Sequence, residues 1–180
     1  MKKFELTNEF ITNMFGTKLF RIRALVEFGD VEAGELGGYV EKESNLGHDD
    51  NAWVYDNAWV YGDAQVSGDA QVSGDALVYG NARVYGNAWV YGNALVCGNG
   101  DYAYAHGFGS VNRTTTFFRL KDGGVGVRCG CFYGTLAQFR DKIRETHGES
   151  AIAEEYLDLA ALMEKRFRRT GNEQKTEEES

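Results

Sequence analysis

The sequence predicts a mainly β protein whose centre is a solenoid of stacked coils. The first observation is a six-residue unit, Gly/Asp–Asn/Asp–Ala–x–Val–Tyr/Ser, that occurs eight times in succession over residues 50–97. The second is the constant spacing of two between each alanine and the valine after it. That spacing places both side chains on one face of a short strand and the residue between them on the other. Because so short a strand cannot bury a face alone, the repeats must stack, as in other solenoids.

The turn positions of the repeats indicate how many strands make one coil. Aspartate occupies this position at Asp63, Asp69 and Asp75, and asparagine occupies it in the other repeats. With two hexads per coil, Asp63 would stack on Asp75 at the strand spacing of about 4.8 Å, which is a repulsive pair. With three, the columns are Asn51/Asp69/Asn87, Asn57/Asp75/Asn93 and Asp63/Asn81/Asn99, and no aspartate stacks on another. We therefore expect three hexads per coil, the period of left-handed hexapeptide β-helices.

Residues 1–46 are expected to form an N-terminal cap with the strand that leads into the solenoid, and residues 47–105 the β-helix. Val40 and Leu46 lie twelve and six residues before Ala52, so we expect them in phase with the alanines. The glycines at 34, 37 and 38 indicate tight turns where the leading strand bends onto the first coil. Solenoids need such a cap to cover their open end.

Residues 106–169 are expected to form a hairpin and a helix pair. Two strands, 114–120 and 125–132, flank a turn at 121–124. Thr135 and Gln138 form a capping box for a helix that ends at Gly148, and an apolar stripe predicts a second helix over 151–168. The polar, acidic residues 170–180 predict a disordered tail. The basic residues 165–169 are expected to complement the C-terminus of the second helix.

Residues 21–46 and 53–56 resemble the N-terminal segment of YdcK-type hexapeptide-repeat proteins. Residues 117–119 and 132–135, with the helices that follow, are similar to the C-terminal module of short members of that family from phages and prophages. The resemblance covers residues 20–168. It implies a left-handed parallel β-helix with a C-terminal hairpin and two helices, and a phage or prophage origin. It implies no particular reaction, because fold does not determine function.

Composition excludes several classes of partner and compartment. The net charge of −8 argues against general nucleic-acid binding, which needs clustered lysine and arginine. No apolar run approaches the ~20 residues of a membrane helix, so no membrane partner is expected. The first residues lack the apolar stretch of a signal peptide, and the three cysteines are an odd number. Together these features predict the reducing cytoplasm of a bacterial host cell.

On a coil of three hexads the outward positions form three faces. The first face carries Trp59, Leu77 and Leu95 beside Tyr61, Tyr79 and Cys97; the second carries Trp53, Gln71 and Trp89 beside Tyr55, Ser73 and Tyr91; the third carries Gln65 and Arg83 beside Ser67 and Tyr85. Aromatic rings bury ~150–250 Å² each when they are covered. We therefore expect the C-terminal helices or a second subunit to cover an aromatic face, and short hexapeptide β-helices are commonly trimers. The residues assigned to binding are Trp53, Tyr55, Trp59, Tyr61, Tyr79, Arg83, Tyr85, Trp89 and Tyr91.

No catalytic residue, metal site or cofactor is expected. For His48, His106 and His147 the sequence shows no evident carboxylate that would orient the ring, and no inserted loop interrupts the coils. Cys129 and Cys131 are two apart on a strand, so we expect both to point the same way into an apolar environment. A metal site would need a second cysteine pair, which the sequence lacks.

These observations favour a non-enzymatic binding or assembly protein, a homo-oligomer for which a trimer is expected. The most specific version of this hypothesis is a phage counter-defence protein that binds a host immune protein or a nucleotide signal, since tryptophan and tyrosine are common hot-spot residues. One alternative is a hexapeptide-repeat acyltransferase that uses acyl-CoA and a loop histidine. The other is a structural virion component or a polymer-forming protein.

Overall fold

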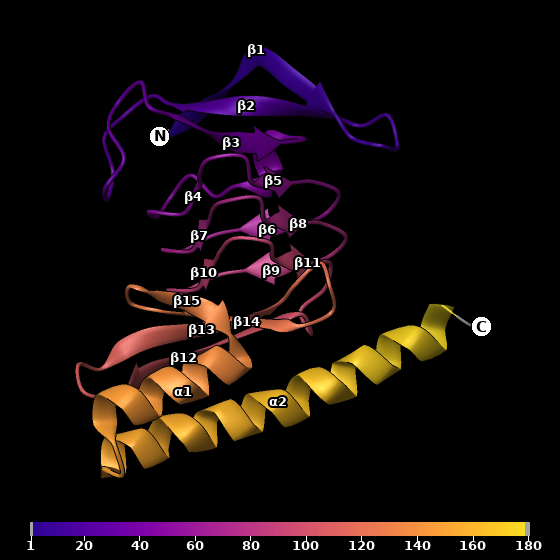
Figure 1. The fold of residues 1–180 in the computed structure, drawn as a ribbon. Coiled ribbons are helices and arrows are strands. Elements are labelled where there is room, and N and C mark those ends of the chain that lie inside the picture. The colour runs from indigo at the N-terminus through magenta and orange to yellow at the C-terminus, as the bar shows by residue number, and fades with distance from the viewer. Residues whose placement is uncertain (1, 179–180) are drawn as a thin grey trace. The chain divides into compact units, whose positions relative to one another are not determined.

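The computed structural model describes residues 2–178 in two compact units, 1–99 and 100–180. Figure 1 shows the strands and helices of both units. The boundary lies at residues 99 and 100 and not at 105 and 106, where the sequence analysis ended the β-helix. The difference arises because β12 (Tyr102–Phe108) pairs with β13 (Arg113–Arg119) instead of continuing the coils. Tyr102 and Tyr104 in β12 are two residues apart, as the alanine and valine of each repeat are, so the sequence of β12 resembles a degenerate repeat.

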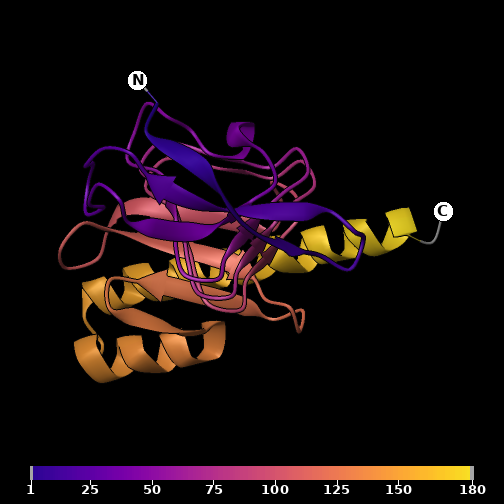
Figure 2. The same cartoon turned by 90° about the horizontal axis from the view of Figure 1, so that it is seen from above.

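The first unit is built around a parallel β-helix with three strands per coil, as predicted. Its strands are β4 (Trp53–Val54), β5 (Trp59–Val60), β6 (Gln65–Val66), β7 (Gln71–Val72), β8 (Leu77–Val78), β9 (Arg83–Val84), β10 (Trp89–Val90) and β11 (Leu95–Val96). Parallel pairing gives the strand orders β4–β7–β10, β5–β8–β11 and β6–β9. Paired residues such as Trp59 and Leu77 are therefore one coil apart. Seen from above, successive coils overlie one another (Figure 2).

The interior of the coils contains the repeated alanines and valines. Each of these side chains, from Ala52 to Val96, is at most 1% exposed. At the corners, the glycines of the regular repeats adopt positive φ, and a Cβ at Gly74 would lie 2.9 Å from the Gly92 nitrogen. The predicted turn columns also form, because the Asn51 amide donates to Asp69 Oδ1 at 2.8 Å.

An antiparallel sheet covers the N-terminal end of the coils. It contains β1 (Phe4–Thr12), β2 (Lys18–Ala24) and β3 (Leu36–Val40), and β3 then pairs in parallel with β5. Val40 pairs with Val60 and Leu46 bridges to Val66, so both occupy valine positions. The expected phase with the alanines is therefore wrong by two residues, because the lead-in coil is longer than the regular ones.

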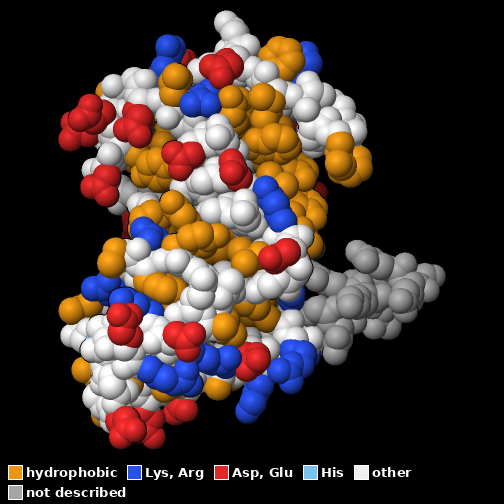
Figure 3. Space-filling view, viewed as in Figure 1, with side chains coloured by type: hydrophobic (Ala, Val, Ile, Leu, Met, Phe, Trp, Pro, Cys, Tyr) orange, Lys and Arg blue, Asp and Glu red, His pale blue; other side chains and the backbone are white. Residues whose placement is uncertain are grey.

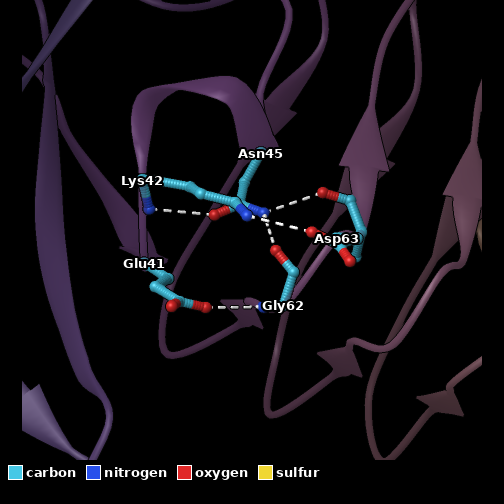
Figure 4. Close-up of polar contacts among 6 residues, drawn as sticks. Glu41, Lys42, Asn45, Gly62 and Asp63 are labelled. Atoms are coloured by element: carbon cyan, nitrogen blue, oxygen red, sulfur yellow. Dashed lines mark hydrogen bonds and ion pairs between the residues drawn. The ribbon is translucent and has the colours of Figure 1, made fainter.

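A polar cluster fixes this longer coil at the short 3₁₀ helix Glu43–Asn45 (Figure 4). The buried Asn45 amide donates to the carbonyl oxygens of Gly62 at 3.1 Å and Ala64 at 2.8 Å. The Glu41 carboxylate accepts from the Gly62 nitrogen at 2.7 Å, and Lys42 pairs with Asp63 at 3.1 Å. These bonds satisfy backbone groups that the irregular coil leaves out of the strand ladders.

The second unit is a four-stranded antiparallel sheet with two helices. Its strand order is β12–β13–β14–β15, with β14 at Val125–Cys129 and β15 at Phe132–Thr135. The predicted hairpin is its central pair, β13 and β14. The return strand ends at Cys129 because Gly130 turns the chain with φ of 58°. The predicted capping box of Thr135 and Gln138 begins α1 (Leu136–His147), and Gly148 caps its end.

Helix α2 runs from Ala151 to Glu178, which corrects two predictions. It does not end near residue 168, and residues 170–178 continue it instead of forming a disordered tail; residues 179–180 lie outside the described residues. Glutamate, glutamine and lysine in this stretch are good helix formers, which explains its backbone conformation. The basic residues 165–169 are consequently inside the helix. Arg168, for example, pairs with Glu164 at 3.5 Å. Between residues 2 and 178, no helix is both long enough and apolar enough to span a bilayer.

Val72→Asp should prevent folding of the solenoid. Val72 is fully buried between Val54 and Val90, so the substitution places an unpaired charge inside the stack at a cost of several kcal/mol. The neighbouring variant Gln71→Glu, which changes an outward residue, should melt cooperatively. Circular dichroism during heating checks both, and a cooperative melt of Val72→Asp at the parent temperature would contradict the inward assignment.

Candidate functional site

The first face of the solenoid forms a regular ladder of large side chains. Parallel pairing aligns Trp59, Leu77 and Leu95 in one row, which continues to Tyr39 in the cap. Beside this row the rings of Tyr61 and Tyr79 stack with centroids 5.2 Å apart and planes 6° apart. All of these side chains except the buried Tyr39 are half-buried. A band of hydrophobic side chains is visible down this side of the solenoid (Figure 3).

The second face differs from the prediction because Trp53 is not a surface residue. Its side chain is 0% exposed, with the rings of Phe28 at 5.3 Å and Phe4 at 6.2 Å. The cap covers it, and a Cβ at Gly37 would lie 2.8 Å from the indole. Trp53 is therefore a core residue and not a binding residue. The indole N–H has no acceptor among the described residues, so its contribution is apolar.

The remaining members of the second face are half-buried or buried. Trp89 donates its indole N–H to Ser73 Oγ at 2.9 Å and packs edge-on against Tyr91 at 6.1 Å. Tyr55 is half-buried, and burial is the main cause of its raised pKa. The indole N–H of Trp89 therefore has its hydrogen-bond partner within the solenoid itself.

The third face is the most accessible of the three. Gln65, Ser67, Arg83 and Tyr85 are all exposed, and Tyr85 is 53% exposed. The structure thus separates the sequence-predicted binding residues into a half-buried apolar ladder, a partly covered aromatic group and an exposed polar face. Arg83 and Tyr85 are the sequence-predicted binding residues that are exposed.

A buried cation lies beneath the cap, and sequence analysis did not find it. Lys3 is 3% exposed, and its ammonium donates to the carbonyl oxygens of Asp50 at 2.7 Å and Ala52 at 2.8 Å. The Phe28 ring lies 4.5 Å from the same nitrogen. Burial lowers the pKa of Lys3 from 10.5 to about 8. This side chain caps carbonyls of the irregular corner, a structural role for which a lysine near the N-terminus gives no sequence signal.

The three histidines lie in three different environments. His48 stacks on Phe4 at 4.5 Å and its Nδ1 accepts from the Lys3 backbone at 3.2 Å. His106 Nδ1 bonds Thr114 Oγ1 at 2.8 Å, and His147 stacks on Tyr156 at 5.9 Å. Within the described part of the chain, no group of three or more histidine, cysteine, aspartate or glutamate residues has the geometry of a metal site.

The two neighbouring cysteines do not both occupy an apolar interior, contrary to prediction. Cys129 is half-buried and accepts a hydrogen bond from Thr115 Oγ1 at 3.1 Å, whereas Cys131 is exposed. The left-handed turn at Gly130 breaks the strand alternation on which the prediction depended. Both thiols nevertheless line one cavity of the second unit.

The regular coils match a known repeat. The sequence model of the YdcK beta solenoid repeat matches residues 52–68, 70–86 and 78–92. The repeat region is therefore similar to the YdcK beta solenoid repeat. The matched segments lie within the coils and extend neither to the cap nor to the second unit. No curated protein matches the chain in sequence.

Trp53→Ala should destabilise the solenoid by about 3–5 kcal/mol, the usual cost of removing a buried large aromatic side chain. Trp53→Phe should retain most of the stability, because the lost indole N–H makes no hydrogen bond among the described residues. Trp89→Ala, which removes a half-buried ring, should cost about 1–2 kcal/mol. Urea denaturation measures all three, and equal losses for the two alanine variants would place Trp53 at the surface.

The buried Lys3 should make the stability of the solenoid unit rise between pH 8 and pH 10.5. The pKa of Lys3 is lower in the folded protein than in the unfolded chain, so the unfolded chain binds more protons in this pH range. Raising the pH removes this proton binding and therefore destabilises the unfolded chain relative to the folded protein. Below pH 8 the full penalty of the buried charge remains. The parent should therefore gain stability relative to Lys3→Met from about pH 7.5 to 9.5, as measured by urea denaturation. If the free energies of unfolding of the parent and of Lys3→Met change with pH in parallel, the buried Lys3 does not have this effect on stability.

Proposed function

We propose that this protein is a non-enzymatic binding and assembly protein whose first solenoid face joins copies of the chain into a homo-oligomer, a trimer in the form we favour. The observation that carries the proposal is the ladder of Trp59, Leu77 and Leu95 beside the stacked Tyr61 and Tyr79. A flat, rigid and apolar ladder can pack against another subunit with little loss of side-chain entropy.

Polar groups delimit this ladder at the cap. Arg21 Nη1 donates to the Tyr39 hydroxyl at 3.0 Å, and that hydroxyl donates to Glu9 Oε1 at 3.0 Å. An apolar centre with a polar margin is the usual anatomy of a protein interface. The row from Tyr39 to Leu95 thus has the composition of an interface that ends at the cap.

The cap supports a closed oligomer over an end-to-end polymer. The strands β1, β2 and β3 cover the N-terminal end of the coils, where a further coil from another chain would have to stack. Association through a side face instead allows a ring of subunits to close. This argument favours assembly of limited size over a structural filament.

The histidine environments support a non-enzymatic role. Stacking on Phe4 and the bond from the Lys3 backbone occupy His48, while His147 packs on Tyr156. A general base needs a free nitrogen near the substrate proton and a partner that orients the ring. The acyltransferase alternative would therefore rest on His106, which is exposed and bonded to Thr114, or on His147, which lines a cavity of the second unit.

The exposed third face is the surface we assign to a partner outside the oligomer. Arg83 and Tyr85 are residue types enriched in binding hot spots, and both are accessible. In the counter-defence form of the proposal, this face binds a host immune protein or a nucleotide signal. That role and the phage origin stay predictions from the family resemblance.

Leu77→Lys should convert the oligomer to a monomer, because it places a charge at the centre of the ladder. Gln65→Lys is the matched control, since it changes the equivalent position of another column, on the exposed third face. Light scattering after size-exclusion chromatography measures the mass of each. A parent that is monomeric at micromolar concentration, or a Leu77→Lys variant that remains oligomeric, would overturn the assembly proposal.

A further inference from the structure

We propose that the second unit contains a separate binding site, a cavity that takes a small organic anion carrying an aromatic ring. We refer to it as the C-terminal cavity. Its walls come from the end of β14, from α1 and from the first turns of α2. All of its lining residues belong to the second unit, so the site is independent of the solenoid faces and of the assembly proposed above.

The volume of the C-terminal cavity sets the size of its ligand. It measures about 240 Å³, which corresponds to roughly eight water molecules at ~30 Å³ each. Ligand sites in proteins usually measure about 300–1,000 Å³, so this one lies just below the usual range. A single aromatic ring with a charged group is suited to such a space, whereas a peptide or a dinucleotide is not.

Positive charge lines the cavity in a chain whose net charge is −8. Arg113 and Lys142 contribute cations, His147 contributes an imidazole, and no aspartate or glutamate is among the lining residues of the described chain. Among residues 2–170, whose side chains the structure describes, no carboxylate forms an ion pair with Arg113. Lys142 pairs with Glu145 at 2.8 Å, but that contact is exposed and therefore weak. A carboxylate or phosphate group can thus bind Arg113 and Lys142 at little electrostatic cost.

Aromatic rings form the apolar part of the cavity. The centroids of Phe132 and Phe139 lie 5.5 Å apart, and Tyr156 packs edge-on against Phe139 at 5.8 Å. Burial is the main cause that raises the pKa of Tyr156 to about 12, and its hydroxyl accepts a hydrogen bond from Cys129 Sγ at 3.9 Å. Packed rings beside cations select for a ligand that combines an aromatic group with negative charge.

Calorimetry on the full chain tests this proposal with four probes that separate charge from ring. Benzoate and phenyl phosphate carry both features, benzyl alcohol carries only the ring, and inorganic phosphate carries only the charge. Benzoate or phenyl phosphate should bind with a Kd of about 1 mM or tighter, and both single-feature probes about tenfold more weakly. The better of benzoate and phenyl phosphate identifies a carboxylate or a phosphate ligand. Failure of both to bind would overturn the proposal.

Charge variants locate the binding within the molecule. Lys142→Gln and Arg113→Gln should each weaken binding about tenfold, the effect of losing one charge-assisted hydrogen bond. Arg144→Gln is the matched control: it removes the same charge from the same helix but does not line the cavity. Its affinity should be unchanged. Equal weakening by Lys142→Gln and Arg144→Gln would indicate non-specific attraction and would also overturn the proposal.

The cysteines provide a second readout that does not depend on any substitution. Cys129 and Cys131 line the cavity, whereas Cys97 belongs to the solenoid unit. Saturation with the better probe should slow the reaction of Cys129 and Cys131 with N-ethylmaleimide and leave the rate at Cys97 unchanged, as followed by peptide mass spectrometry. If the bound probe changes the rate at none of the three cysteines, the ligand binds elsewhere.

Discussion

The whole solenoid depends on the parallel stacking of buried alanine and valine side chains from one coil to the next. Each strand has only two residues, so no strand is stable by itself and every coil derives its stability from its neighbours. The constraint is geometric, because a shift of one residue would turn valines outward and the variable residues inward. Glycines with positive φ at the corners allow the backbones of successive coils to approach closely, as between Gly74 and Gly92.

The first coil shows how the protein ends this pattern at the N-terminus. Its chain is two residues longer than a regular coil and contains a 3₁₀ turn, so polar side chains replace some of the ladder hydrogen bonds. Asn45 donates to two carbonyls of the next coil, and the Lys3 ammonium donates to two carbonyls of the first coil at 2.7 and 2.8 Å. Placing a charge there is costly, since burial lowers the Lys3 pKa to about 8. Polar caps of this kind separate the regular coils from the antiparallel sheet above them.

The sequence predicted the repeating parts well and the unique parts poorly. The columns of aspartate and asparagine were sufficient for the coil period, and Thr135 with Gln138 for the start of α1. Trp53 and Trp89 occupy equivalent repeat positions, yet only Trp53 is fully buried, because the cap that covers it follows no repeat. Polar composition at residues 170–178 is compatible with both a helix and disorder. The C-terminal cavity combines residues from separate elements, such as Arg113 and Lys142. No local sequence pattern indicates that these residues lie close together in the fold.

The most direct test of the stacking account is a pair of internal deletions compared by thermal denaturation. Deleting residues 70–87 removes one complete coil, so Ala88 takes the place of Ala70 and every remaining column stays in register. The account predicts a folded protein with a cooperative transition at a somewhat lower temperature. Deleting only residues 70–72 shifts the inward and outward positions of every later strand and should abolish the transition. A cooperative transition in the shorter deletion, with none in the complete-coil deletion, would contradict the account.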